Sequence, residues 1–148
     1  YLLEVLEREM QRAARIEGTL TFAMIDIDHF KSVNDTYGHL IGDHVLRSLS
    51  RLLGERLRKT DTVGRYGGEE FGVVLFNTAT DDAKLIMDEL RESFSRISFH
   101  AGGEEFTVTF SCGLAQFPER SEPSSLVEAA DHALYAAKEN GRNQVVIA

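Results

Sequence analysis

Two carboxylates stand at the end of a long apolar run near the start of the chain. The run Leu20–Ile27 is typical of a buried strand, and it closes in the triplet Asp26-Ile27-Asp28. Carboxylates crowded at the end of a buried strand repel each other and lose hydration, and a bound Mg²⁺ ion relieves both effects. A strand end whose acids point into water explains the triplet equally well. The triplet alone therefore leaves a metal site and a solvated strand end open.

A turn with two glycines and two glutamates occupies Arg65–Phe71. Gly67 and Gly68 permit positive φ angles in a tight turn, and they allow a ligand to approach the backbone closely. The strand that follows is almost entirely apolar, which places it inside a sheet rather than at an edge. A central hairpin can hold Glu69 beside the end of the strand that carries Asp26. We therefore expect carboxylates from two strands to converge on one cation.

The same five residue types, GGEEF, recur at Gly102–Phe106. The flanking residues separate the two copies, because the second is followed by Thr107–Phe110, in which polar and apolar residues alternate. Such alternation is typical of a strand with one wet face, where glutamates point into water at little cost. We interpret the second copy as an ordinary hydrophilic hairpin.

Two cations, Lys138 and Arg142, lie four residues apart across the end of the last expected helix. Cations at this place complement the helix dipole, which is a sufficient structural reason for them. They are also suited to neutralise a triphosphate, since arginine makes bidentate contacts with phosphate. The spacing alone does not decide between these interpretations.

The elements that must position these residues follow from the apolar periodicity. We expect helices over residues 1–16, Asp43–Leu57, Thr80–Phe94 and Ser124–Asn140, and strands over Leu20–Ile27, Thr62–Tyr66, Glu70–Phe76, Ile97–Ala101, Glu105–Phe117 and Gln144–Ile147. Thr80 or Asp81 is expected to cap the third helix, and Gly141 to follow the last one. Hairpins mixed with crossover helices indicate an α+β sandwich of the ferredoxin-like kind, with helices against a mostly antiparallel sheet.

The overall composition predicts one soluble domain over residues 1–148. The chain has 16 Lys+Arg against 24 Asp+Glu, a formal net charge of −8, which disfavours nucleic-acid and membrane-surface binding. The single cysteine, Cys112, lies in an apolar run, so we expect a buried, inert thiol in a reducing cytoplasm. The sequence begins inside a helical pattern without a Met, which we interpret as a fragment of a longer regulatory protein.

Several motifs together resemble the GGDEF-domain diguanylate cyclases, with the signature in its GGEEF form. They are Met24–Lys31, Asn34–His39, Gly42-Asp43, Arg65–Phe71 and Lys138 with Gly141-Arg142-Asn143. The resemblance runs from about Leu3 to Val146 and implies the palm-type fold of nucleotidyl cyclases. It also implies the condensation of two GTP into cyclic di-GMP with release of pyrophosphate.

The resemblance assigns the catalytic centre by position. It implies Asp26, Glu69 and the main-chain carbonyl of Ile27 as ligands of Mg²⁺ or Mn²⁺. Glu69 also corresponds to the base that activates the 3′-hydroxyl, and Glu70 to a second glutamate needed for catalysis.

The resemblance assigns guanine recognition to Asn34 and Asp43. A carboxylate at position 43 accepts from guanine N1–H and N2–H, and adenine offers no matching pair of donors, so we expect GTP to be preferred over ATP. The other substrate contacts it implies are His29, Phe30, Lys31, His39, Gly67, Gly68, Lys138 and Arg142.

The resemblance further implies a homodimer and a product site. Each monomer would hold one GTP, so two half-sites must meet face to face. Arg58 and Asp61 match the R-x-x-D of the family's inhibitory site for cyclic di-GMP, although a helix end followed by a strand start also explains them. Arg91 is available as the further arginine that such inhibition recruits.

Two other functions remain open on the sequence, and an upstream sensory domain is expected. One is a non-enzymatic module that binds GTP or cyclic di-GMP. The other is a Mg²⁺-dependent phosphotransferase that uses Asp26 as nucleophile and does not require Glu69.

Overall fold

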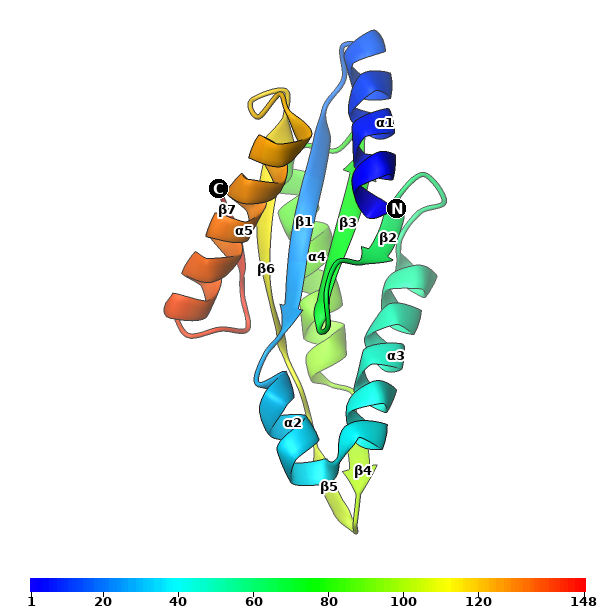
Figure 1. The fold of residues 1–148 in the computed structure, drawn as a ribbon, viewed down its shortest axis with the longest axis vertical. Helices are drawn as coiled ribbons and strands as arrows, with labels where there is room; N and C mark the ends of the chain where they lie inside the picture. The colour runs from blue at the N-terminus through cyan, green and yellow to red at the C-terminus, as the bar shows by residue number, and fades with distance from the viewer.

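The computed structural model describes all of residues 1–148, and two sheets and five helices account for most of them (Figure 1). The helices are α1 (Leu2–Arg15), α2 (Phe30–Tyr37), α3 (His39–Arg56), α4 (Thr80–Ser95) and α5 (Pro123–Glu139). The strands are β1 (Leu20–Ile27), β2 (Thr62–Arg65), β3 (Glu70–Phe76), β4 (Phe99–Ala101), β5 (Glu104–Phe106), β6 (Phe110–Phe117) and β7 (Val145–Ile147).

The main sheet has the strand order β2-β3-β1-β6-β7. Every neighbouring pair is antiparallel except β6 and β7, which run parallel. All eight residues of β1 are buried, so the apolar run at Leu20–Ile27 forms the central strand. The expected α+β architecture with a mostly antiparallel sheet is confirmed.

Helices cover both faces of this sheet, and β1 alternates between them. Phe22 and Met24 pack in a core of 15 buried residues with α1 and α5, whereas Ile25 and Ile27 pack in a core of 23 with α3 and α4. Figure 1 shows α1 and α5 in front of the sheet and α4 behind it. Because side chains alternate along a strand, Asp26 shares its face with Met24 and points toward α5.

α5 lies unusually close to β6. A Cβ atom added at Gly113 would overlap the backbone of α5 at Ala130 and Leu134. A glycine is therefore required on β6 for this helix to sit at its observed depth.

Three predicted elements differ in the structure. The residues between β1 and α3, expected as a loop, contain α2, which buries only Phe30 and Val33 and so has a weak apolar period. α3 begins at His39 rather than at Asp43, because Leu40 points into water and interrupts the pattern. The predicted strand Glu105–Phe117 is two strands in different sheets, β5 pairing with β4 and β6 pairing with β1.

The predicted cap of the third helix is also wrong. Ala79 is the N-cap residue of α4, and neither Thr80 nor Asp81 supplies a capping side chain. The Gln116 side chain takes that role from β6, since its Oε1 accepts the N–H of Thr80 at 2.8 Å.

The only thiol of the chain, Cys112 on β6, is fully buried and free, as expected. Its burial raises the pKa of the thiol far above the usual range. None of the five helices combines the length and hydropathy that a transmembrane span requires.

Candidate active site

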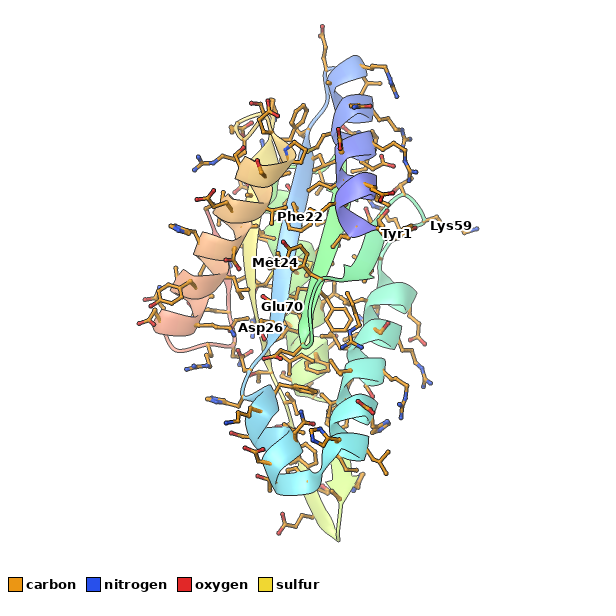
Figure 2. The ribbon with its side chains drawn as sticks, in the orientation of Figure 1. Tyr1, Phe22, Met24, Asp26, Lys59 and Glu70 are labelled. Atoms are coloured by element: carbon orange, nitrogen blue, oxygen red, sulfur yellow. The ribbon has the colours of Figure 1, made fainter.

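Carboxylates from two strands meet at the lower end of the central sheet. Asp26 of β1 lies directly opposite Glu70 of β3, and both residues belong to the face covered by α5 (Figure 2). The carbonyl of Glu69 accepts the N–H of Ile27 at 3.3 Å, which joins the turn before β3 to the end of β1. Like charges directly opposite each other destabilise a sheet, so the pairing of Asp26 with Glu70 lowers the stability of the fold.

Asp26 is buried, and its two oxygens have different surroundings. Oδ2 accepts from Lys138 Nζ at 2.6 Å, whereas the buried Oδ1 has no hydrogen-bond partner. Burial raises the pKa of Asp26 despite the lysine, and the charges of Glu69 and Asp28 add to the effect. A buried carboxylate oxygen without a partner destabilises the folded protein, and such an oxygen is the type of ligand that a hard cation such as Mg²⁺ prefers.

Glu70 is half-buried beside Asp26. Burial raises the pKa of its carboxyl, followed by the charges of Asp26 and of Asp131 on α5. The Glu70 side chain also lines a cavity of about 520 Å³ between α1 and α5, together with Met24. A pair of carboxyls with raised pKa values at the edge of a cavity is typical of a functional site.

Asp28, the second acid of the triplet, is fully occupied by hydrogen bonds. It accepts from Thr109 Oγ1 and Ser111 Oγ at 2.7 Å each, and from the backbone N–H of Asn143 at 3.0 Å. The sequence did not predict this anchoring role, because nothing in the spacing indicates that the start of β6 and the loop after α5 reach the same carboxylate.

The turn between β2 and β3 corrects one sequence argument. Gly67 and Gly68 do not adopt positive φ, so the backbone conformation does not require them, and Gly68 faces open space. The carbonyl of Gly68 accepts from the Arg65 guanidinium, which fixes the turn. Of the two reasons for glycine, positive φ does not apply here, and close approach of a ligand remains an expectation.

The second GGEEF copy shows the opposite behaviour. Gly102 and Gly103 have φ of 57° and 83° and form the two-residue turn between β4 and β5. Glu104 and Glu105 are exposed, as the hydrophilic-hairpin interpretation predicted.

The two residues expected to read a base lie side by side because of a glycine. A Cβ atom at Gly42 would overlap the amide of Asn34, so this glycine admits the Asn34 side chain against α3, next to Asp43. Asp43 lines a groove of about 360 Å³ between α3 and the start of β3, with Arg65 and Phe71. His39, the first residue of α3, is exposed one turn before Asp43.

The start of α2 forms a tight corner after β1. His29 is exposed with φ of 56°, in the left-handed region that non-glycine residues seldom adopt. Phe30 is buried in the core and Lys31 is exposed.

α5 delivers both cations to this end of the sheet. Lys138 lies in its last turn and contacts Asp26, whereas Arg142 is exposed just beyond it. Gly141 follows the helix with φ of 111°, and the N–H of Arg142 donates to the carbonyl of Ala137 at 2.9 Å, so the expected glycine ending is present.

The two residues of the R-x-x-D motif, Arg58 and Asp61, form an ion pair with each other. Arg58 makes a bidentate pair with Asp61, with distances of 2.8 and 3.1 Å, and donates to Thr78 Oγ1 and the carbonyl of Phe76. Arg58 is half exposed, with 52% of its side-chain surface accessible. Arg91 is engaged elsewhere, with Asp88 and with Asn143.

No three carboxylate, imidazole or thiol side chains lie close enough together to hold a metal ion by themselves. A cation bound between Asp26 and Glu69 would therefore complete its shell with backbone, water or substrate oxygens, which is how Mg²⁺ is usually bound in proteins. The unpartnered Oδ1 of Asp26 fits such an ion.

Comparison with known proteins identifies the family. Residues 1–144 match the family model described as "Diguanylate cyclase, GGDEF domain". The chain belongs to the GGDEF family. The predicted resemblance is thereby confirmed, and the palm-like α+β fold is that of the family's solved structures.

Relatives of this GGDEF domain are found among both curated proteins and solved structures. It is 41% identical over 147 residues to diguanylate cyclase DgcP of Pseudomonas aeruginosa, covering 99% of this chain and 22% of DgcP. The GGDEF domain of DgcB from Caulobacter crescentus in complex with c-di-GMP superposes with a TM-score of 0.93 at 34% identity, covering 97% of this chain and 86% of that one.

The active GGEEF domain of a diguanylate cyclase from Vibrio cholerae superposes with a TM-score of 0.88 at 34% identity, over 95% of this chain and 89% of that one. The chain spans between 22% and 36% of the length of the first curated relatives that it matches.

Proposed function

We propose that this GGDEF domain is a Mg²⁺-dependent diguanylate cyclase that joins two GTP molecules into cyclic di-GMP and releases pyrophosphate. The observation that carries the proposal is the opposed pair of Asp26 and Glu70, with a buried, unpartnered oxygen on Asp26. Membership of the family and likeness to a GGEEF domain described as active support it.

Asp26, the carbonyl of Ile27 and Glu69 are the groups we propose to hold Mg²⁺ or Mn²⁺. When bound, the cation supplies positive charge that stabilises the charge developing on the α-phosphate. Glu69 takes the proton of the attacking 3′-hydroxyl, and Glu70 supports the same centre. Burial and the neighbouring charge of Asp26 raise the pKa of the Glu70 carboxyl, which favours its protonated form more than in a solvated glutamate.

Asn34 and Asp43 are proposed to read guanine in the groove beside α3. Asp43 accepts from the two donors on the guanine edge, and an adenine in the same place leaves the carboxylate unpaired. His39 contacts the same substrate from the start of α3. Gly67 and Gly68 are proposed to border the opposite side of the site, where Gly68 faces open space and Gly67 lies against the Glu70 side chain.

The triphosphate is proposed to lie between two positive elements. The backbone at His29, Phe30 and Lys31 meets it from the end of β1, and Lys138 and Arg142 meet it from α5. Lys138 is paired with Asp26, so it is already at the carboxylate centre that the phosphates approach.

We propose that each chain supplies one GTP half-site and that a two-fold homodimer is the active species. We also propose that cyclic di-GMP binds at Arg58 and Asp61, where the product has to separate the bidentate pair. Because Arg91 is bound to Asn143, it does not serve that site in this arrangement. Arg58→Ala should weaken product binding in a cyclic di-GMP titration.

The setting of the domain is likewise a proposal. GTP and a free buried thiol both suit the cytoplasm. The greater length of the curated relatives supports a sensory domain elsewhere in the full protein, with this chain as its cyclase domain.

Incubation with GTP and Mg²⁺, followed by chromatography for cyclic di-GMP, tests the proposal. Glu69→Gln and Glu70→Gln should abolish product, and the matched changes Glu104→Gln and Glu105→Gln in the second GGEEF copy should not. Binding of GTP without turnover would replace the cyclase with a non-enzymatic module. A phosphorylated Asp26 would indicate a phosphotransferase instead.

A further inference from the structure

The loop after α5 has an unusual backbone for its residue types. Arg142 and Asn143 are consecutive non-glycine residues with φ of 65° and 48°. Asparagine tolerates the left-handed region, whereas arginine is placed there at a cost, so the surrounding structure has to hold the pair in place.

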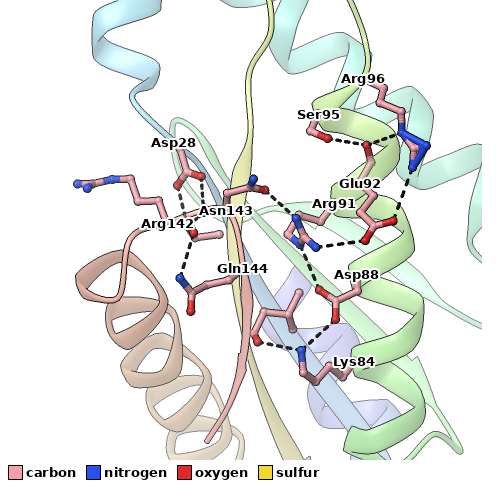
Figure 3. A network of polar contacts seen from close by, with 12 residues as sticks. Asp28, Lys84, Asp88, Arg91, Glu92, Ser95, Arg96, Arg142, Asn143 and Gln144 are labelled. Carbon is pink, nitrogen blue, oxygen red and sulfur yellow. Dashed lines mark hydrogen bonds and ion pairs between the residues drawn. The ribbon is translucent and has the colours of Figure 1, made fainter.

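Asn143 is held from two sides. Its backbone N–H donates to Asp28 Oδ2 at 3.0 Å and to Ser111 Oγ at 3.2 Å, which ties it to the ends of β1 and β6. Its side-chain Oδ1 accepts from Arg91 Nη1 of α4 at 2.9 Å (Figure 3). The loop is thereby joined to a helix on the opposite face of the sheet.

Arg91 is itself fixed by acids of its own helix. It pairs with Asp88 at 3.1 Å and with Glu92 at 3.6 Å, and only 16% of its side-chain surface is exposed. Lys84, one turn before Asp88, also pairs with Asp88 and donates to the carbonyl of Val145 at 3.3 Å. α4 therefore contacts the segment that follows Arg142 at two points, Asn143 and Val145.

The loop leaves Arg142 free at its tip. The carbonyl of Arg142 accepts from Gln144 Nε2 at 3.0 Å, but its exposed guanidinium makes no hydrogen bond or ion pair and points away from the network (Figure 3). Because no other residue holds the Arg142 side chain, the conformation of its backbone determines where the guanidinium points.

We infer that Arg91 and Asn143 are positioning residues for Arg142: they hold the strained loop so that the Arg142 guanidinium faces the triphosphate. The inference rests on the proposed function, since it assigns Arg142 to the phosphates of GTP. Both residues act through the loop and are not assigned a contact with the substrate, so their loss should weaken phosphate binding and leave base recognition intact.

The test uses Arg91→Ala and Asn143→Gly, the second of which keeps the left-handed backbone and removes only the side chain. Binding of a non-hydrolysable GTP analogue with Mg²⁺ is measured by calorimetry, and guanosine is measured as a competitive inhibitor. Each variant should raise the Kd of the analogue and the KM for GTP about three- to tenfold, with kcat nearly unchanged. Inhibition by guanosine should not change.

A double variant and a matched control complete the design. Because both changes remove one shared hydrogen bond, the double variant should bind the analogue no more weakly than either single variant. Arg96→Ala removes a guanidinium that also pairs with Glu92 but does not reach the loop, and it should match the wild type.

Additive effects, equal weakening of guanosine, or variants that match the wild type would each overturn the inference while the cyclase proposal stands. A wild-type chain that binds no analogue would overturn both.

Discussion

At the scale of single residues, Asp26 combines functional value with a cost to the fold. Its carboxyl is buried, faces Glu70 and leaves one oxygen without a partner. Burial raises its pKa in the folded state above the unfolded value. The folded protein therefore takes up a proton more readily than the unfolded chain, and its stability falls as pH rises through this range.

Removing the charge of Asp26 should raise the stability of the protein and lower its cyclase activity. Asp26→Asn should unfold at a higher temperature than the wild type at neutral pH, because the buried charge is gone, and its midpoint should depend less on pH above about 4. Cyclase activity should fall at least about 100-fold. Thermal unfolding across a pH series measures the first effect. Asp35→Asn, at an exposed carboxylate, serves as the control, and a destabilised Asp26→Asn would contradict the argument.

A bound cation should have the same effect as removal of the charge. Mg²⁺ that binds only the folded state should raise the midpoint of thermal unfolding by about 3 °C or more at saturation, and chelation should reverse the rise. The shift should be absent in Asp26→Asn and reduced in Glu69→Gln. An equal shift in all three proteins would assign the effect to non-specific ion binding.

At the scale of elements, the depth of α5 on β6 sets the position of Lys138. The helix backbone passes over Gly113 without room for a Cβ atom. Lys138 is fixed by this contact because it lies on the same helix two turns further on, and it reaches Asp26 only from that depth.

Gly113→Ala should therefore lower both stability and activity. The added methyl group overlaps backbone rather than a flexible side chain, so α5 has to shift, at a cost of about 2–4 kcal/mol in the free energy of unfolding. Chemical denaturation measures this loss. Gly54→Ala in α3 meets no atom within 4 Å and should be neutral or stabilising by up to about 1 kcal/mol. Equal behaviour of the two variants would contradict the packing argument.

The elements also show where sequence reasoning reaches its limit. The central strand was predictable because all its residues are buried, and the end of α5 because Gly141 marks it. The split of Glu105–Phe117 was not, because Thr107–Thr109 keep the same alternation while the chain crosses from one sheet to the other. α2 was missed because its two buried residues leave too little periodicity.

The arrangement of the candidate site was also predictable only in part. The meeting of Asp26 with the GGEEF turn followed from two apolar strands, but the pairing of Asp26 with Lys138 joins residues that are 112 positions apart. No local pattern encodes such a contact. The anchoring of Asp28 by β6 and by the loop after α5 is hidden for the same reason.

At the scale of the whole molecule, one end of the central sheet brings together one set of carboxylates and one pair of cations, and the groove lined by Asp43 lies beside α3. Under the proposed function, a reaction between two GTP molecules would require two chains, and activity would then be a property of the dimer. The net charge of −8 is a property of the whole chain. At the site, by contrast, the carboxylate of Asp26 is paired with the ammonium group of Lys138.

Dilution should therefore lower turnover per chain. Well below the dimer dissociation constant, specific activity should fall about tenfold for each tenfold dilution, since the dimer fraction follows mass action. Initial rates over a hundredfold range of protein concentration measure this, with a chemically cross-linked dimer as control. Flat specific activity in the uncross-linked protein would rule out the half-site scheme.

The lone thiol on β6 gives the protein an internal reporter of its own opening. Cys112 lies between β1 and β7 beneath α4, so a reagent reaches it only when the sheet separates. Labelling with a thiol reagent should be very slow in buffer and should accelerate with denaturant in step with global unfolding. At reagent concentrations where labelling outpaces refolding, the rate of modification of Cys112 equals the unfolding rate of the protein, without any added probe.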